Sequence, residues 1–171
     1  MDIKLKKITP NEIDLLKNEM KKSFTQGVID RFRDPSAAPI PSDSDITRVL
    51  NDSCCDIFII TADTAPAGAA IIKHGQNRKY SLELFFIFKD FLNKKIGSAA
   101  WQVIERHYPD AEIWETCTPY FERRNIHFYL HKCGFKIVEF FSEYHKDEHD
   151  LTDKFKDINT SGFFRFEKII K

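Results

Sequence analysis

The sequence predicts an α/β (α+β) fold, in which helices cover both faces of a mixed, mostly antiparallel sheet of about seven strands. Short apolar segments of strand length recur along the chain, separated by turn residues or by segments with helical periodicity. Residues 75–78 read Gly-Gln-Asn-Arg, a hairpin turn between two apolar segments. The length of 171 residues suits one domain, residues 1–171, with a substantial core.

The first third of the chain predicts a strand, a helix, a loop and a second helix. Alternating apolar residues indicate a strand over residues 3–8. Residues 9–12 have the pattern of a capping box, so a helix should begin there and continue to about Phe24. Three prolines make a loop of residues 26–44, and a short helix is expected over residues 43–50.

Three strands and a helix are expected in the middle of the chain. Residues 56–62, 67–74 and 80–88 are apolar segments bounded by turn residues. The last two should pair as an antiparallel hairpin. A helix is expected over residues 96–107, because a helix usually ends before a residue such as Pro109.

The last third predicts three strands and a helix that begins with Asn125. Residues 142–160 are charged and irregular, and residues 151–155 could form a short helix within them. The strands are expected at residues 111–116, 135–141 and 163–169.

The charge balance and the distribution of apolar residues exclude several classes of partner. Lys plus Arg and Asp plus Glu both number 26, so the formal net charge is zero. A nucleic-acid-binding protein would have a strong basic bias. No apolar stretch reaches the ~18 residues of a membrane span, and the first residues are charged rather than signal-like. We therefore expect a cytoplasmic protein with no nucleic-acid or membrane partner.

The cysteines do not have the spacing of a metal site. Two of them are adjacent and cannot close on one tetrahedral ion as a Cys-x-x-Cys pair does. We expect no metal site, and we expect four reduced, mostly buried thiols at Cys54, Cys55, Cys117 and Cys133.

The most informative segment is an apolar strand followed by a basic turn and a helix. Residues 82–88 lead into Lys94, Lys95 and Gly97, where the helix begins. A helix N-terminus presents free backbone N–H groups and the positive end of the helix dipole, which together suit a phosphate group. Gly97 lets the backbone approach a ligand, and the lysines add positive charge. The segment therefore predicts a pyrophosphate site.

A second segment indicates which pyrophosphate is bound. Residues 118–135 contain Asn125 and Tyr129, end in Gly134-Phe135 and precede an apolar strand. Together the two segments, over about the last 115 residues of the chain, resemble the GNAT superfamily of N-acetyltransferases. In that superfamily the first segment is the pyrophosphate loop for acetyl-CoA, Gln/Arg-x-x-Gly-x-Gly/Ala, and the second lies beside the acyl end of CoA. The resemblance implies the GNAT fold, with a splay between the fourth and fifth strands.

The resemblance also implies which residues bind acetyl-CoA. The backbone of Ile87 and Phe88 would contact the pantetheine arm as an added strand does. Asn125 would hydrogen-bond the pantetheine or a water molecule near it, although it could also be a plain N-cap residue. The N–H groups that would hold the pyrophosphate belong to Asn93, Lys94, Lys95, Ile96, Gly97 and Ser98.

The chain departs from the family pattern at two positions. Aligned on Gly97, the first Gly of the family loop falls on Lys95, which must then adopt a conformation that Gly usually supplies, unless the loop has another shape. Tyr129 lies five residues before Gly134, whereas the Tyr of the family lies four before its Gly, the position of Leu130 here.

Acyl transfer from a thioester to an amine requires an acid for the leaving thiolate and removal of a proton from the amine. Tyr129 is the candidate acid, with a packed structural Tyr as the alternative. Glu83 is the candidate base, because it lies four residues before Ile87, as the general-base glutamate does in the histone-modifying members. An apolar strand would desolvate its carboxylate and strengthen it as a base. A solvated Glu83, with the proton passed through water, is the alternative.

Three other residues are weaker candidates. Glu115 ends a predicted strand and could be a base. Cys117 lies near the splay, but direct transfer makes a cysteine nucleophile unnecessary. His127 is expected to be solvated or structural.

The acceptor is expected to be an amine-bearing small molecule or peptide. In the superfamily its site is built from segments that correspond to residues 24–40 and 142–162. The second segment contains acidic residues that could favour a cationic amine, or could belong to a solvated loop: Glu143, Asp147, Glu148, Asp150 and Asp153.

Three functional hypotheses follow. The first is an acetyl-CoA-dependent N-acetyltransferase. The second is an acyl-CoA-binding regulatory or degenerate module without turnover. The third is a structural subunit of a dimer whose partner carries the activity; a homodimer fits the resemblance, since dimers are common in the family.

Overall fold

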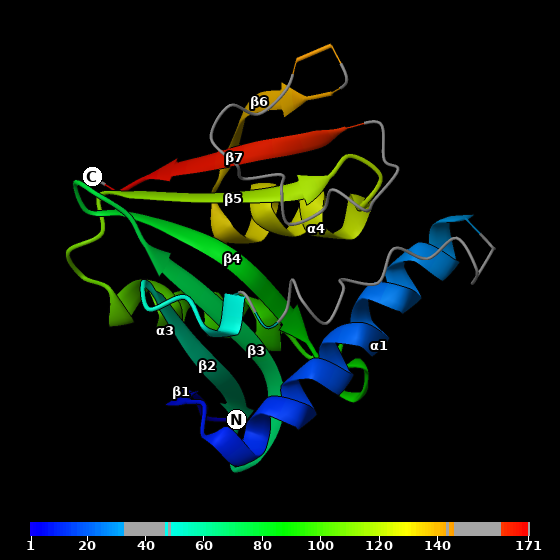
Figure 1. The fold of residues 1–171 in the computed structure, drawn as a ribbon, viewed down its shortest axis with the longest axis vertical. Coiled ribbons are helices and arrows are strands. Elements are labelled where there is room, and N and C mark those ends of the chain that lie inside the picture. Colours follow the sequence, from blue (N-terminus) through cyan, green and yellow to red (C-terminus); the bar gives the residue numbers. More distant parts are fainter. Residues whose placement is uncertain (33–46, 48, 143, 146–161, 171) are drawn as a thin grey trace.

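A computed structural model of the protein describes residues 1–32, 47, 49–142, 144–145 and 162–170, with the backbone alone for residues 24–32. Seven strands form one sheet in the order β1-β2-β3-β4-β5-β7-β6 (Figure 1). They are β1 (Ile3–Lys7), β2 (Cys55–Ala62), β3 (Ala65–His74), β4 (Lys79–Ile87), β5 (Ile113–Pro119), β6 (Lys136–Phe141) and β7 (Phe163–Ile169). All neighbouring strands are antiparallel except β4 and β5, which are parallel. The predicted mixed, mostly antiparallel sheet is confirmed.

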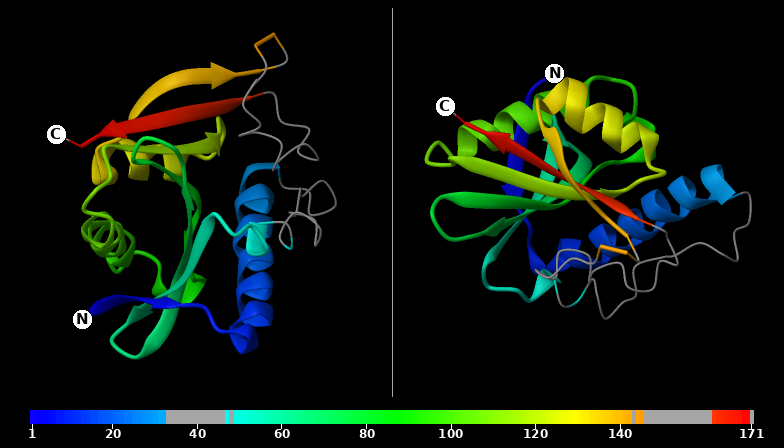
Figure 2. Two further views of the ribbon diagram at one scale, coloured as in Figure 1. Left: turned by 60° about the vertical axis from the view of Figure 1, so that its left-hand side comes forward. Right: turned by 90° about the horizontal axis from the view of Figure 1, so that it is seen from above.

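Helices cover both faces of this sheet. Figure 2 shows helix α1 (Ile13–Phe32) on one face and helix α3 (Ile96–His107) on the other. Helix α4 (Arg123–Phe128) follows β5 and continues directly into a π-helical turn, Tyr129–Cys133. A single 3₁₀ turn, Pro10–Glu12, precedes α1.

The alternation of side chains along the inner strands supplies a core on each face. Phe58 and Ile60 of β2 pack with Trp101 of α3 in the larger cluster. Ile59 lies between them in sequence and packs instead with Leu16 of α1. This period of two is what an apolar strand covered on both faces requires.

The described helices agree with the predicted ones except at the end of α1 and at the start of α4. We expected α1 to end near Phe24 and a loop to begin at residue 26, but α1 continues to Phe32. Gly27 alone does not stop a helix, and the first proline after the helix is Pro35. The helix expected at residues 151–155, and most of the helix expected at residues 43–50, lie outside the described residues.

The parallel strands β4 and β5 form a fork. Their pairing is confined to residues 79–81 of β4 and 113–115 of β5, after which the strands separate (Figure 1). The expected splay between the fourth and fifth strands is therefore present. The antiparallel ladder on the other side of β4 contains a bulge at Glu83, because Ile72 pairs with Leu82 and Ile71 pairs with Leu84.

The bulge changes which face each residue of β4 presents. Leu82 packs in the cluster beneath α3, whereas Leu84 packs in a cluster with Met20 of α1. In a regular strand these two residues would share a face. The bulge at Glu83 therefore bends and twists β4 just where it leaves β5.

None of the helices in the described part of the chain combines the length and the apolar character that crossing a membrane demands.

Candidate functional site

The loop between β4 and α3 contains two residues in the left-handed conformation. Lys95, the N-cap residue of α3, has φ 61° and ψ 8°. Asn93 has φ 63°. This conformation costs a residue with a Cβ atom about 1–2 kcal/mol, which is why Gly usually occupies it. Lys95 therefore adopts the conformation that its alignment with a family Gly required.

The N-terminus of α3 has unused backbone donors. The first helical hydrogen bond runs from the N–H of Ala99 to the carbonyl of Lys95, at 3.2 Å. The three preceding N–H groups, of residues 96–98, have no partner within the helix. Among the described residues no side chain caps this end, and the first turn has no acidic residue. Two exposed lysines, Lys94 and Lys95, lie beside it. Such an end suits a phosphate group.

Gly97 brings α4 close to α3. A Cβ atom at this position would lie 3.3 Å from the ring of Phe128 and 3.7 Å from Ile87. The ring of Phe128 also stacks on Phe85 of β4, with centroids 5.4 Å apart. In this structure the small size of Gly97 therefore serves the packing of one aromatic ring across the fork. Its predicted role, a close approach to a ligand, stays a prediction.

The backbone groups of Phe88 are already engaged. Its N–H donates to the carbonyl of Ala67 at 2.8 Å, and its carbonyl accepts a hydrogen bond from the N–H of Phe91 at 2.9 Å. The Phe88 N–H is thus not available to a pantetheine amide. The predicted backbone contact at Ile87, which is paired with Gly68 of β3, stays a prediction.

Asn125 lies within the first turn of α4 rather than at its start. The helix begins at Arg123, and its N-cap residue is Glu122. The prediction that Asn125 begins the helix is wrong by two residues, because a turn closed by the carbonyl of Pro119 and the N–H of Glu122 starts the helix earlier. The side-chain amide of Asn125 donates to Thr118 Oγ1 of β5 at 3.3 Å. This contact fixes the amide against the fork.

The unusual spacing from Tyr129 to Gly134 is accommodated by the π-helical turn. The N–H of Gly134 donates to the carbonyl of Tyr129, five residues earlier, and Gly134 has φ 79°. A π turn contains one residue more than an α turn. The added residue is therefore absorbed after Tyr129. Lys168 Nζ supports the turn by donating to the carbonyl of Cys133 at 2.7 Å.

Tyr129 consequently points into the core at the fork. Its side chain is buried and packs against Phe166 of β7, with ring centroids 5.5 Å apart. Burial raises the pKa of the Tyr129 phenol, although the nearby Thr116 hydroxyl opposes the rise. The phenol therefore keeps its proton at neutral pH and can donate it.

Comparison with known proteins identifies the family. Residues 16–135, more than half of the chain, match the model of the acetyltransferase (GNAT) family. The chain belongs to the GNAT acetyltransferase family. It is therefore an acetyltransferase, as the resemblance of the two sequence segments predicted.

This GNAT protein is also similar to individual proteins. It is 38% identical over 166 residues to the uncharacterized protein YrkN of Bacillus subtilis strain 168, covering 94% of this chain and 90% of the relative. The PaiA N-acetyltransferase of Thermoplasma acidophilum, solved with coenzyme A, has a TM-score of 0.70 at 17% identity and covers 99% of this chain and all of its own. A GNAT acetyltransferase of Elizabethkingia anophelis, solved with acetyl-CoA, has a TM-score of 0.67 at 13% identity, over 98% of each chain. At such identities the two structures demonstrate a shared fold.

The two candidate bases of the GNAT protein have different surroundings. Glu83 is half-buried at the bulge of β4. Glu115 is also half-buried, and its Oε2 lies 2.7 Å from Lys79 Nζ and 3.8 Å from Arg165. Glu115 is therefore part of an ion-pair cluster that joins β4, β5 and β7. The role of either glutamate as a base stays a prediction.

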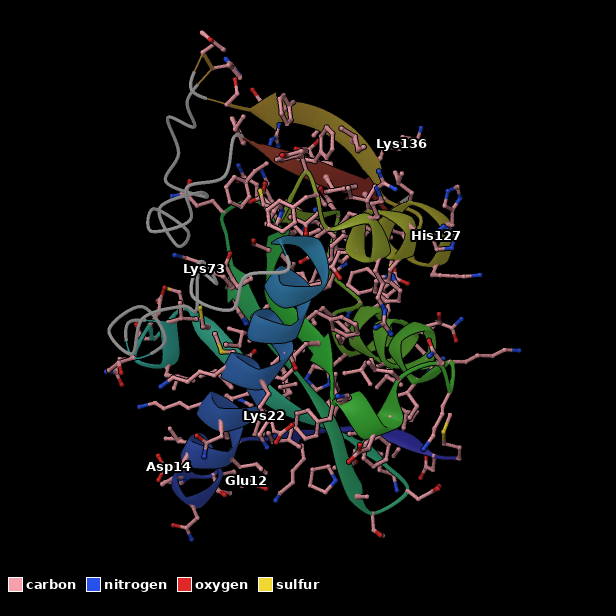
Figure 3. The ribbon with its side chains drawn as sticks, turned by 90° about the vertical axis from the view of Figure 1, so that its right-hand side faces the viewer. Glu12, Asp14, Lys22, Lys73, His127 and Lys136 are labelled. Atoms are coloured by element: carbon pink, nitrogen blue, oxygen red, sulfur yellow. The ribbon has the colours of Figure 1, made fainter. Side chains whose placement is uncertain are left out.

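The remaining candidates contribute little to the site. His127 projects from the outer side of α4 (Figure 3) and is exposed, as expected. Its ring lies 4.8 Å from that of His131. Among the described residues no group of three or more His, Cys, Asp or Glu side chains could hold a metal ion.

The four cysteines are free thiols, but they are less buried than expected. Cys133 is buried, Cys55 and Cys117 are half-buried, and Cys54 is exposed. Cys54 lies at a turn before β2, whose apolar residues begin only after it.

The predicted acceptor segments are mostly outside the described part of the protein. The acidic residues of the second segment all fall there: Glu143, Asp147, Glu148, Asp150 and Asp153.

Sequence reasoning missed Thr116 and Phe128. Thr116 is buried and its hydroxyl donates to the carbonyl of Leu82 on β4 at 2.9 Å. Such a bond to a distant backbone carbonyl leaves no pattern in the sequence. A polar residue at the end of the predicted strand 111–116 was the only signal.

Proposed function

We propose that this GNAT protein transfers the acetyl group of acetyl-CoA to a primary amine of a small molecule or peptide. The observation that carries the proposal is the position of the Tyr129 phenol, buried at the fork between β4 and β5. The uncapped N-terminus of α3 lies near the same fork, where Gly97 approaches Ile87 of β4 and Phe128 of α4. A cofactor with a pyrophosphate at one end and a thioester at the other would place the pyrophosphate at the helix end and the thioester near the phenol.

The chemistry of the α3 loop supports acetyl-CoA as the co-substrate. The N–H groups of residues 96–98 and the left-handed residues Asn93 and Lys95 form a cradle for a pyrophosphate. The lysines at 94 and 95 would offset its charge. Structures that share the fold were solved with coenzyme A and with acetyl-CoA. Acetyl-CoA would supply the activated acetyl group.

The reaction would proceed by direct attack in a ternary complex. The amine nitrogen forms a bond to the acetyl carbon, and the bond from that carbon to sulfur breaks. Glu83 or a water molecule takes the surplus proton of the amine, and Tyr129 gives its phenolic proton to the thiolate. Asn125, held by Thr118, would hydrogen-bond the pantetheine arm.

An amine acceptor agrees with the N-acetyltransferase activity named for the Thermoplasma relative. No described residue restricts the amine further. The cytoplasmic location and the homodimer also belong to the proposal, and gel filtration would test the second.

One observation favours the alternative of a binding module without turnover. Lys95 carries a Cβ atom and a charged side chain at a position where the family has Gly. If that side chain shifts the bound pyrophosphate from its usual position, acetyl-CoA would bind without turnover.

A panel of amines tests the proposal against this alternative. Protein freed of bound cofactor would be mixed with acetyl-CoA and, in turn, with a polyamine, an aminoglycoside, free amino acids and short peptides, while thiol release is followed. Release that depends on one class of amine and yields its N-acetyl product supports the transferase. Tight acetyl-CoA binding without amine-dependent release for any class would favour the binding module.

A further inference from the structure

Thr116 occupies the vertex of the fork. The last pair of the β4–β5 ladder is Ser81 with Glu115, so Leu82 and Thr116 are the first residues beyond it. The Thr116 hydroxyl donates to the carbonyl of Leu82 across the gap at 2.9 Å. A side chain thus replaces the ladder bond at the point where the strands separate, and it satisfies a carbonyl that is remote from water.

Tyr129 is a close neighbour of this hydroxyl. Phe166 of β7 is the register partner of Thr116, and the ring of Tyr129 packs on Phe166. Both Thr116 and Tyr129 are buried, with exposed fractions of 3% and 6%. The Thr116 hydroxyl therefore lies near the phenol, and its presence opposes the rise of the phenol pKa that burial causes.

The properties of a hydroxyl group allow two states of this contact. A threonine hydroxyl has one proton to donate and two lone pairs that accept. While its proton is directed to Leu82, a lone pair of the threonine oxygen can accept a hydrogen bond from the phenol of Tyr129. When the phenol has lost its proton, the threonine proton can turn to the phenolate oxygen instead.

We propose that Thr116 is a positioning residue that acts through Tyr129: it holds the phenol oxygen in place at the fork and donates to the phenolate once the phenolic proton has moved to the sulfur. The inference rests on the proposed function. In the step concerned, the carbon–sulfur bond of the thioester breaks and its electron pair stays on sulfur. The phenolic proton moves to that sulfur, the negative charge moves to the Tyr129 oxygen, and a solvent proton restores the phenol afterwards.

A double-mutant cycle tests this role. Thr116→Val, Tyr129→Phe and the double variant would be compared in thiol release with the best amine of the panel. Thr116→Val should lower kcat about tenfold, which corresponds to the loss of one hydrogen bond that strengthens in the transition state. In the Tyr129→Phe background the same change should alter kcat by less than about twofold, because residues that act as a unit are not additive.

Two controls separate positioning from a merely structural effect. Thr116→Ser keeps the hydroxyl and should restore kcat to within about threefold of the parent. Thr61→Val removes a similar bond, from a strand hydroxyl to the carbonyl of Lys4, far from the fork, and should leave kcat unchanged. The affinity for acetyl-CoA, measured by calorimetry, should stay constant in Thr116→Val. An equal loss of kcat in both backgrounds, or a failure of Thr116→Ser to rescue, would overturn the proposal.

Urea unfolding of the same four proteins gives a readout that needs no activity. The double variant should shift the urea midpoint by less than the sum of the shifts in Thr116→Val and Tyr129→Phe, because the two side chains interact with each other. If the parent protein released no thiol with any amine, the proposed function would fail, whereas non-additive unfolding would still support the contact. Additive midpoint shifts would contradict the inference whatever the activity.

Discussion

Gly134 donates its backbone N–H to the carbonyl of Tyr129, five residues earlier, and this bond closes a π-helical turn beside the fork. An α turn would reach only four residues back. The π turn therefore lets Tyr129, rather than Leu130, face the core, although the Tyr-to-Gly spacing is one residue longer than the family spacing. π turns are often retained at functional sites.

The position of Tyr129 predicts that its hydroxyl is needed for turnover and not for cofactor binding. Tyr129→Phe should lower kcat by about 10²–10⁴, the range of general acid catalysis. The dissociation constant for acetyl-CoA should change little, because the ring still fills the same space. Steady-state kinetics and calorimetry measure the two effects. A variant with unchanged kcat for every amine would remove Tyr129 from the mechanism.

The left-handed backbone of Lys95 predicts that Gly is more stable at this position. Lys95→Gly should raise the free energy of unfolding by up to about 1 kcal/mol, since relief of the left-handed strain exceeds the entropy that Gly adds to the unfolded chain. Urea unfolding of the cofactor-free protein measures the change. Lys94→Gly is the matched control: Lys94 is not among the residues with positive φ, so this variant should be destabilised. Equal effects of the two substitutions would argue against a strained Lys95.

The contact between Gly97 and Phe128 predicts a specific steric coupling. Gly97→Val places atoms where the Phe128 ring lies, and overpacking of this kind costs about 1–3 kcal/mol. Phe128→Leu shortens the opposing side chain. The double variant should therefore be more stable than Gly97→Val alone, as thermal unfolding would reveal. If Phe128→Leu worsened the defect instead, the two residues would not be in contact across the fork.

The lowered pKa of Asp56 predicts that the folded protein loses stability in acid. Burial alone would raise the pKa of Asp56, but hydrogen bonds from His74, Tyr108 and Lys7 together lower it below its ordinary value. A lowered pKa in the folded state stabilises the fold above the ordinary carboxyl pKa of about 3.9, and this stability disappears as the pH falls through the folded-state value.

The measurement is urea unfolding of the parent and Asp56→Asn between pH 7 and the acid transition. The parent should be the more stable protein at neutral pH, and the difference should narrow as the pH approaches the folded-state pKa. Tyr108→Phe removes one of the hydrogen bonds, at 2.8 Å, and should have a smaller effect of the same sign. A constant difference at every pH would exclude the ionised Asp56 as its source.

Much of the fold could be predicted because local signals agree with it. The predicted bounds of α3 match the structure, since Pro109 follows the helix and its apolar residues pack on one face. The end of α1 was misplaced because three prolines predicted a loop of residues 26–44, whereas the first of them is Pro35 and the helix continues to Phe32. Prolines indicate that a loop is present but do not fix the residue at which the preceding helix ends.

The site was less predictable than the fold, because its decisive contacts join residues distant in sequence. The engagement of the Phe88 N–H depends on Ala67, and the role of Thr116 depends on the carbonyl of Leu82. The π turn was visible only as a one-residue change of spacing. Asn125 was placed at the start of its helix because its residue type suits an N-cap, but the preceding turn begins the helix at Arg123.

The central claim is that the loop before α3 and the fork form one site for acetyl-CoA. The most direct test is a calorimetric titration of cofactor-free protein with acetyl-CoA and, separately, with CoA. We predict saturable binding of one molecule per chain, with a dissociation constant in the micromolar range that is typical of enzyme substrates. No heat of binding at near-millimolar acetyl-CoA would contradict the account, because Lys95 would then have closed the cradle that the family keeps open.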